Sequence, residues 1–556
     1  MLAFLRLPGH PARVSPAAQP HRSATLLRRI APVAVVAAAA VAFSSLIRQF
    51  ALPAAALDRV RELQQAMVWI FGVAGGLALV ALALVRRMPE RVARGVPVAC
   101  FLAGVGAYLP FSNDDTFIFA RYARNLAAGH GLVYNLGDRV EGFTSPAWVA
   151  VLAGIARFGF DPVAGGKVLG VLLGAAVVAG IFACVHRLTQ DTTAALFAAA
   201  AFAMNQLFLS WAGSGMDVAL FVAWEVAFFA IVLARRRPDV AVLALAAIGF
   251  LIRPEAYLIA GIVGAWLIAR EWRVARGRAV RWAAVLAMAA ALPVAARWLY
   301  FHTLLPNTYY AKRYLFRREG IGYMADGANY LGWPWVILGL AGLGALLRRE
   351  GWLLAGLAAY AGYYLFAGRD VMSFRLLLFS VPLLMIGLGA LVATVSNVRL
   401  RQALAIAGLG VALVVALHQM ATAPGQLAEQ RGHLYVAGNS LGTFQCDYPA
   451  GLYLARHANP DDWLATDNIG VVGYYGGTKV LDLLGLVNRE TRSEALLAQM
   501  VAQRPRWLLC STEPGPAGER WVIYPVDVHG WAGPLYDPVG RWQSVNGYAR
   551  VLLERR

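Results

Sequence analysis

The sequence predicts an all-α polytopic membrane protein followed by a small α/β domain. Of its 556 residues, 59% are hydrophobic and only 15% are charged, with a mean hydropathy of +0.57. A soluble globular domain is nearer half apolar and a quarter charged. The excess lies in long uncharged stretches, such as 67–85 and 168–185, and it disappears after residue 418. Such stretches are typical of membrane-spanning helices, since an apolar core of ~30 Å needs about 20 apolar residues.

The apolar stretches predict about 11 to 13 transmembrane helices. The N-terminus, 1–29, is rich in Pro and Arg, and we expect it to be disordered and cytoplasmic. Two helices within 30–94, near 30–47 and 66–85, form an additional N-terminal pair. The membrane domain proper covers 95–418, with spans expected near 95–111, 168–186, 193–210, 218–234, 240–252, 256–269, 282–301, 333–347, 351–367, 376–395 and 403–418.

Arginine-rich loops predict the orientation of these helices. The net charge of +19 gathers in short loops at 86–94, 235–237, 270–281, 348–349 and 399–401. Short basic loops mark the cytoplasmic side of a plasma (inner) membrane, and their position between spans argues against nucleic-acid binding. The other polar residues collect in segments that we expect on the extracytoplasmic side: 112–167, 214–217, 253–255, 302–332, 368–375 and 419–556.

The tail, 419–556, has nearly balanced charge, which predicts a small extracytoplasmic α/β domain. Short buried strands are expected at 463–466, 479–484 and 507–510, and a helix at 493–503. Two of the four cysteines, Cys446 and Cys510, lie in this domain. An oxidising compartment would allow a disulfide between them, but their spacing does not establish one.

Two adjacent carboxylates, Asp114 and Asp115, follow the third predicted span directly. An Asp before a helix can cap its free N–H groups, but one Asp is enough for that. A second carboxylate beside it costs repulsion and raises the pKa of one partner, as suits a general base or a metal ligand. We therefore interpret this pair as catalytic.

Several motifs resemble the GT-C membrane glycosyltransferases over roughly residues 95–490. The closest likeness is to their arabinofuranosyltransferase-like branch, which includes the mycobacterial terminal cell-wall arabinosyltransferase and pilin arabinosyltransferases. Besides Asp114-Asp115, the matching residues are Arg121-Tyr122, Gly129 to Asn135, Val140-Glu141-Gly142, Arg253-Pro254-Glu255, Leu305 to Lys312, Gly368-Arg369-Asp370 with Arg375, Asp467 to Gly470 and Asp482 to Gly485.

The resemblance implies a sugar transfer from a polyprenyl-phosphate donor to a glycan or protein acceptor in a bacterial cell envelope. Arabinofuranose is the sugar that it favours. The first outer loop would hold one catalytic carboxylate, and Asp217, two spans later, would supply a second acid; its alternative is a helix cap. Substrate contacts are expected from the polar residues of the matching motifs, namely Arg121, Glu141, Glu255, Asn307, Tyr309 and Asp370.

A lipid phosphate needs cationic partners at the bilayer surface, and arginine can bind it through two N–H groups. The candidates are Arg253, Lys312, Arg369 and Arg375. Their alternative is snorkelling, in which a long side chain carries its charge to the headgroups. Arg253 beside Glu255 and Arg369 beside Asp370 interrupt apolar segments, which favours a functional role.

No cofactor is indicated with certainty. There is no dinucleotide or P-loop fingerprint and no Cys/His cluster, so any metal would be a divalent ion on carboxylates such as Asp114, Asp115 and Asp217. Two other functions stay open. One is a GT-C transferase for mannose or another sugar, and the other is a non-enzymatic flippase or transporter of lipid-linked sugars. A transporter should show inverted repeats, and none is evident.

Overall fold

The computed structural model describes residues 55–109, 112–312, 319–367, 372, 374–427, 443–515, 518–524, 526–544 and 547–556. The N-terminal segment 1–29, the expected span 30–47, and the two predicted site residues Arg369 and Asp370 lie outside the described residues. Lys312 ends a described helix, but its side chain is outside the description as well.

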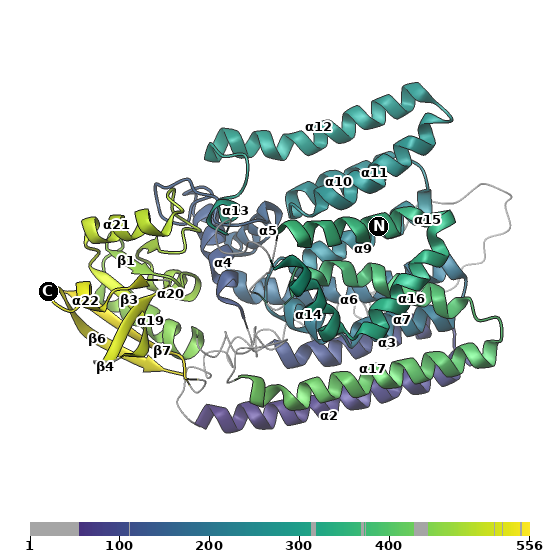
Figure 1. Ribbon diagram of the computed structural model, residues 1–556, viewed down its shortest axis with the longest axis horizontal. Coiled ribbons are helices and arrows are strands. Elements are labelled where there is room, and N and C mark those ends of the chain that lie inside the picture. Colours follow the sequence, from purple (N-terminus) through teal and green to yellow (C-terminus); the bar gives the residue numbers. More distant parts are fainter. Residues whose placement is uncertain are drawn as a thin grey trace, which may run out of the picture.

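Long helices lying side by side form most of the protein (Figure 1). Five of the described helices are long and apolar enough to cross a membrane, and two bent pairs bring the number to seven if each pair crosses once. Others, such as those at 240–252 and 377–393, are apolar but shorter. The total number of spans therefore stays a prediction. The helices of this part are α2 (Ala55–Leu84), η1 (Val85–Arg87), α3 (Glu90–Val105), η2 (Gly106–Tyr108), α4 (Asp114–Ala127), α5 (Pro146–Arg157), α6 (Pro162–Thr189), α7 (Thr192–Ala203), α8 (Gln206–Gly213), α9 (Val218–Arg235), α10 (Val240–Ile252), α11 (Ala256–Trp272), α12 (Arg276–Phe301), α13 (Asn307–Lys312), α14 (Gly320–Leu331), α15 (Trp333–Ala367), η3 (Leu377–Ser380), α16 (Val381–Ala393) and α17 (Val398–Leu427).

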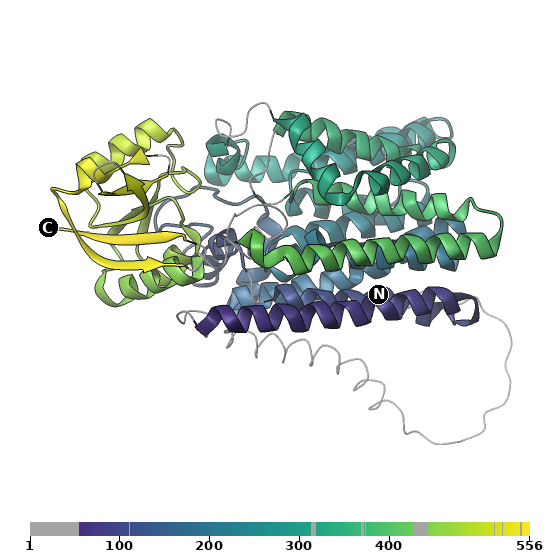
Figure 2. The same ribbon diagram turned by 60° about the horizontal axis from the view of Figure 1, so that its bottom comes forward.

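Small residues let neighbouring helices approach closely. A methyl group on Gly342 of α15 would come within 1.7 Å of the carbonyl oxygen of Gly387 of α16, so only glycine fits at this crossing. Small residues at such contacts are typical of helices that pack in lipid, where apolar burial alone brings helices together weakly. On another side of the bundle, α17 packs along α2 (Figure 2), and the amide of Gln402 donates to two carbonyl oxygens near the end of α2.

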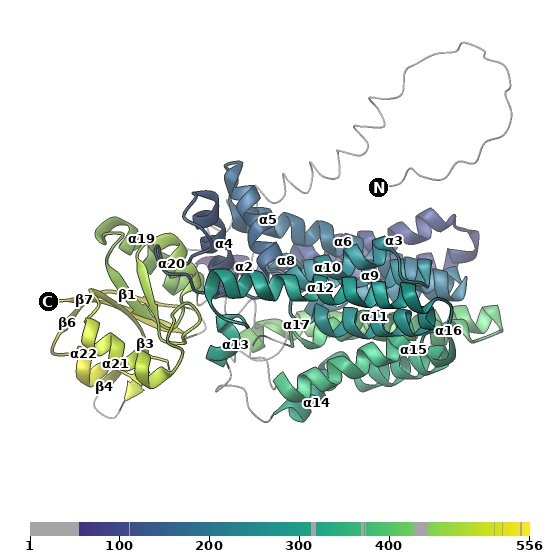
Figure 3. The ribbon, with the colours of Figure 1, turned by 90° about the horizontal axis from the view of Figure 1, so that it is seen from above.

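The predicted outer segments gather at one end of the bundle, where α4, α5 and α13 lie beside the tail (Figures 1 and 3). The basic loop between α11 and α12 lies at the opposite end. Two ion pairs join predicted cytoplasmic loops to each other, Arg236–Glu350 at 2.8 Å and Arg401–Asp191 at 3.0 Å. This arrangement agrees with the predicted topology, while the side of the membrane on which each end lies stays a prediction.

The tail is a small α/β domain, so the predicted fold class is confirmed. Its seven-stranded sheet has the order β2-β1-β3-β4-β5, with β7 pairing with both β3 and β6. The three strands predicted from sequence form its parallel part, and the remaining pairs are antiparallel. Cys446 and Cys510 are both buried free thiols. The elements are η5 (Thr443–Asp447), α19 (Tyr448–His457), β1 (Trp463–Thr466), α20 (Gly470–Gly476), β2 (Lys479–Asp482), α21 (Ser493–Gln503), β3 (Trp507–Gly515), β4 (Gly518–Ile523), β5 (Val526–Asp527), α22 (His529–Ala532), β6 (Tyr536–Gln543) and β7 (Ala549–Arg555).

Candidate active site

The first turn of α4 separates the two adjacent carboxylates. The helix is capped by Asn113, whose side-chain oxygen accepts from the backbone N–H of Asp115 at 3.0 Å. Neither Asp114 nor Asp115 therefore caps the helix, and the alternative interpretation of the pair is wrong. Asp114 is buried, whereas Asp115 is partly exposed. The two acids thus have different surroundings despite being neighbours in sequence.

Asp114 points into the tail. Its two carboxyl oxygens accept from the backbone N–H groups of Gly470 and Val471, at 2.7 and 2.8 Å, at the start of α20. The approach is so close that a methyl group on Gly470 would lie 1.9 Å from the backbone oxygen of Asp114. Burial, together with the nearby negative charge of Asp447, raises the pKa of Asp114 to about 8, although the two N–H groups act in the opposite direction.

A second junction attaches α4 to the membrane domain. The hydroxyl of Thr116 donates to the carbonyl oxygen of Ser214 at 3.2 Å, and the indole N–H of Trp148 donates to that of Gly215 at 3.2 Å. Gly215 has a φ of +85°, a conformation that favours glycine. The 214–217 loop, which carries Asp217, is thereby held against the start of α4.

Asp217 belongs to a buried ion-pair cluster. Its carboxylate lies 2.7 Å from Nη1 of Arg253, and the Nε and Nη2 atoms of Arg253 each lie 3.0 Å from an oxygen of Glu255. All three side chains are at most 4% exposed. Asp217 occupies the position before α9 but makes no capping bond, so its carboxylate serves Arg253 instead. Arg253 is not a snorkelling residue, because carboxylates surround its guanidinium.

Arg375 extends this cluster. It is 8% exposed, its guanidinium lies 5.8 Å from the ring centre of Trp211, and it is within electrostatic range of Glu255. With Arg375 included, two guanidinium groups face two carboxylates. The four charges balance, so binding a phosphate here requires an arginine to turn from its carboxylate toward the phosphate.

Three of the predicted substrate-binding residues are occupied in contacts that hold the first loop, the segment around α13 and the tail. Arg121 donates to the carbonyl oxygens of Tyr134, Gly473 and Thr478, and the amide of Asn307 donates to those of Gly485, Leu486 and Asn488. Glu141 pairs with Arg297 at 2.5 Å, and its backbone oxygen accepts from the N–H of Asn307. Tyr309 is 53% exposed. These contacts fix the loops, and roles in substrate binding stay predictions.

Sequence reasoning missed the part that the tail plays at this site. Arg550 is buried between Asp447 and Asp467, at 3.0 and 2.7 Å, close to the docking point of Asp114. Tyr474 donates to Asp161 at the end of the first loop and packs against Phe117 of α4. A buried arginine far along the chain gives no sequence signal of its own. Only the Asp467-Asn468-Ile469-Gly470 motif pointed toward this region.

Among the residues that the structure describes, no group of three or more His, Cys, Asp or Glu side chains is arranged to hold a metal ion.

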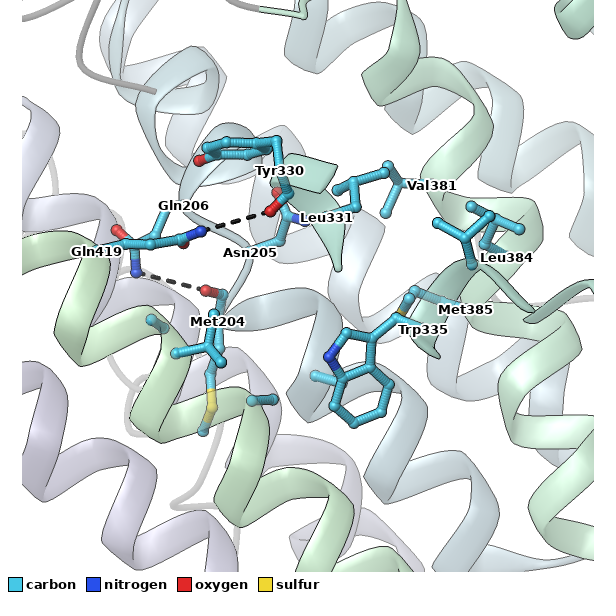
Figure 4. Close-up of a pocket in the computed structure, with 15 residues that line it drawn as sticks. Met204, Asn205, Gln206, Tyr330, Leu331, Trp335, Val381, Leu384, Met385 and Gln419 are labelled. Atoms are coloured by element: carbon cyan, nitrogen blue, oxygen red, sulfur yellow. Dashed lines mark hydrogen bonds between the residues drawn. The ribbon is translucent and has the colours of Figure 1, made fainter. Parts of the chain in front are cut away.

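A cavity of about 70 Å³ lies at the break between α7 and α8, bounded also by α14 and α17 (Figure 4). Its walls are mostly apolar, with the amides of Asn205, Gln206 and Gln419 as the main polar groups. None of the predicted site residues lines it.

Comparisons with known proteins agree with this architecture. The fold resembles a crystal structure of ArnT from Cupriavidus metallidurans bound to undecaprenyl phosphate, with a TM-score of 0.51, 14% identity, and coverage of 85% of this chain and 97% of that chain. The apo crystal structure of the same ArnT gives a TM-score of 0.48, 16% identity, and coverage of 79% and 93%. The membrane domain and tail together therefore have an ArnT-like fold.

In the tail, a family model described as a domain of unknown function (DUF8728) matches residues 439–553. No curated relative matches the sequence. The likeness to ArnT thus concerns the fold, while the arabinofuranosyltransferase branch rests on the sequence motifs alone.

Proposed function

We propose that the protein is a membrane glycosyltransferase that takes its sugar from a polyprenyl-phosphate carrier. The observation that carries the proposal is the junction between α4 and the 214–217 loop, which joins the helix that begins with Asp114 and Asp115 to the loop whose Asp217 pairs with Arg253. Acids and arginines thus gather at one end of an ArnT-like bundle. Sugar transfer needs a base for the acceptor and cations for the departing phosphate. ArnT, a GT-C glycosyltransferase, has been crystallised with undecaprenyl phosphate, which supports the choice of carrier.

The two adjacent acids take different roles in this proposal. Asp115, which is partly exposed, accepts the proton of the acceptor hydroxyl while the new glycosidic bond forms. The bond between the sugar and the phosphate breaks, and its electron pair leaves with the polyprenyl phosphate. Arg375 and Arg253 neutralise that phosphate, with Lys312 and Arg369 as further predicted partners. Asp114 is already used by α20 and holds the tail in place.

The sugar, acceptor and side of the membrane form the finer part of the proposal. The first-loop motifs favour arabinofuranose, transferred to a glycan or a protein such as pilin on the extracytoplasmic face. An alkaline phosphatase fused after Arg556 should be active in cells if the tail lies outside. An active cytoplasmic reporter at the same position, with an inactive phosphatase, would contradict that placement.

The decisive experiment combines lipid analysis with an assay of transfer. A strain lacking the protein should accumulate one polyprenyl-phosphate sugar, and mass spectrometry of its lipids identifies that sugar. The purified full-length protein, given the synthetic form of the same lipid and envelope acceptor from the deletion strain, should release polyprenyl phosphate. If no lipid-linked sugar accumulates and none is consumed, the proposal is wrong.

A further inference from the structure

The part of α15 that follows its kink at Glu350 carries three tyrosines within little more than one turn, Tyr360, Tyr363 and Tyr364. Residues three and four apart share one side of a helix. The rings of Tyr360 and Tyr364 are stacked, with centres 6.1 Å apart and planes inclined by 6°. The three hydroxyl groups nevertheless reach three different segments of the protein.

Each of these segments carries a member of the ion-pair cluster. The hydroxyl of Tyr363 donates to Oε1 of Glu255 at 3.2 Å, and that of Tyr364 donates to the carbonyl oxygen of Leu376, which follows Arg375, at 2.8 Å. The hydroxyl of Tyr360 donates at 2.6 Å to Glu225, which lies on α9, the helix that begins directly after Asp217. One turn of α15 therefore contacts Glu255 itself, the residue that follows Arg375, and the helix that follows Asp217.

The contact with Glu225 is a specific bond and more than general packing. Glu225 is fully buried within α9, and within the described part of the chain its second carboxyl oxygen has no hydrogen-bond partner. A buried carboxyl group without a cation is neutral, because an unpaired charge in an apolar interior is far too costly. The hydroxyl of Tyr360 donates to the other oxygen of this group, and the bond ties α9 to α15.

Glu255 shows how such a contact can act on the arginines. Its Oε1 atom accepts both from Nη2 of Arg253 at 3.0 Å and from the hydroxyl of Tyr363. A second donor on the same oxygen weakens the hold of Glu255 on Arg253, since the carboxylate charge is shared between them. Arg253 can then turn toward an incoming anion at lower cost.

We propose that Tyr360, Tyr363 and Tyr364 are positioning residues that set the geometry of the cluster for the phosphate of the lipid donor, with Tyr363 acting through Glu255. This inference rests on the proposed function. It adds residues that touch neither donor nor acceptor, and it predicts an effect on donor affinity rather than on the chemical step.

The test measures transfer by the full-length protein from a synthetic polyprenyl-phosphate sugar. Tyr363→Phe removes one oxygen and should raise the KM for the lipid about three- to tenfold, as expected for one hydrogen bond, with kcat and thermal unfolding nearly unchanged. The matched control is Tyr257→Phe. Its hydroxyl also lies in the bundle, but it donates to the backbone oxygen of Ala290 and to no member of the cluster that the structure shows, so the KM of this variant should match that of the wild type.

A double-mutant cycle separates positioning from packing. If Tyr363 acts through Glu255, adding Tyr363→Phe to Glu255→Gln should change the KM much less than Tyr363→Phe does alone. Additive effects would overturn the proposal, as would a wild-type KM in Tyr363→Phe or loss of folded protein in that variant. Tyr360→Phe, which acts through Glu225, should raise the same KM, and an effect on kcat alone would contradict the inference. An inactive wild type would instead refute the proposed function.

Discussion

Asp114 and Asp217 are both buried carboxylates beside the start of a helix, and the sequence analysis expects a catalytic role for each of them. Their partners differ. Asp114 is bound by two backbone N–H groups of the tail, whereas Asp217 is bound by the guanidinium of Arg253. A backbone N–H group is neutral and is fixed in the chain. An arginine side chain is charged and can turn toward another anion. Asp114 therefore docks the tail onto α4, whereas Asp217 belongs to a cluster of charged side chains.

Asp115 differs from both of these buried acids because it is partly exposed, and its substitution should have the largest effect on the rate of transfer. As the proposed base it must be anionic, so Asp115→Asn should lower transfer by about 10²–10⁴-fold while the protein stays folded in the membrane. The rate is measured as release of polyprenyl phosphate. Asp138→Asn, also in the first loop, is the matched control and should keep full activity. A normal rate of transfer by the Asp115→Asn variant would contradict the assignment of Asp115 as the base.

Arg253→Ala should have the largest effect on stability. It leaves Asp217 and Glu255 buried without their cation, and breaking such a pair costs about 3–5 kcal/mol. Thermal unfolding of the purified protein measures the loss. Arg124→Ala is the control, because its pair with Asp161 is nearly half exposed and should contribute at most about 1 kcal/mol. Equal losses in the two variants would contradict the distinction between the cluster and a surface ion pair.

Arg375→Ala should have an intermediate effect, on substrate binding. A charge-assisted contact to phosphate contributes about 1.5–3 kcal/mol, so the KM for the lipid donor should rise roughly ten- to hundredfold. The KM for the acceptor should stay nearly unchanged. A rise in the acceptor KM alone would place Arg375 on the other substrate and remove it from the donor site.

Asp114→Asn should have the smallest effect and a distinctive pH dependence. An amide can accept only one of the two N–H bonds, which costs about 0.5–1.5 kcal/mol of stability. The folded protein raises the pKa of Asp114 from 3.8 to about 8. The stability that the Asp114 carboxyl group contributes is therefore complete below its unfolded pKa of 3.8. This stability is lost as the pH rises through the folded pKa of about 8.

Unfolding temperatures measured from pH 5 to pH 8.5 check this prediction. The wild type should lose stability across the window, and Asp114→Asn should lose less. Some slope will remain, because burial also raises the pKa of Asp447, and it raises that of Asp482 to about 7. The Asp138→Asn control should follow the wild type. Identical pH profiles for Asp114→Asn and the wild type would show that docking does not depend on the protonation of Asp114.

Local patterns predicted much of the fold. Apolar runs indicated the long helices, and the tail strand at 463–466 and the helix at 493–503 appear with the predicted bounds. These elements depend on short-range periodicity, which the sequence displays directly. The antiparallel part of the tail sheet was not predicted. Its strands contain exposed residues and prolines such as Pro514 and Pro538, which obscure the pattern.

The site was predictable in its residues but less so in their contacts. The motifs identified Asp217, Arg253 and Glu255, which the structure joins in one cluster. The same motifs placed Arg121 and Asn307 at the substrate, whereas the structure shows both bound to backbone oxygens of the tail. A polar residue that holds distant loops together looks the same in sequence as one that holds a ligand. Only the long-range contacts distinguish the two cases.

The close fit between Asp114 and Gly470 also has a consequence for biogenesis. The two residues are 356 positions apart in the chain, so the first loop is synthesised long before its partner exists. At synthesis rates of about 5–20 residues per second, the delay is roughly 20 to 70 seconds. During that time the nascent chain has its acidic pair but lacks the domain against which that pair packs. The contact between Asp114 and α20 therefore forms only after the tail has been synthesised.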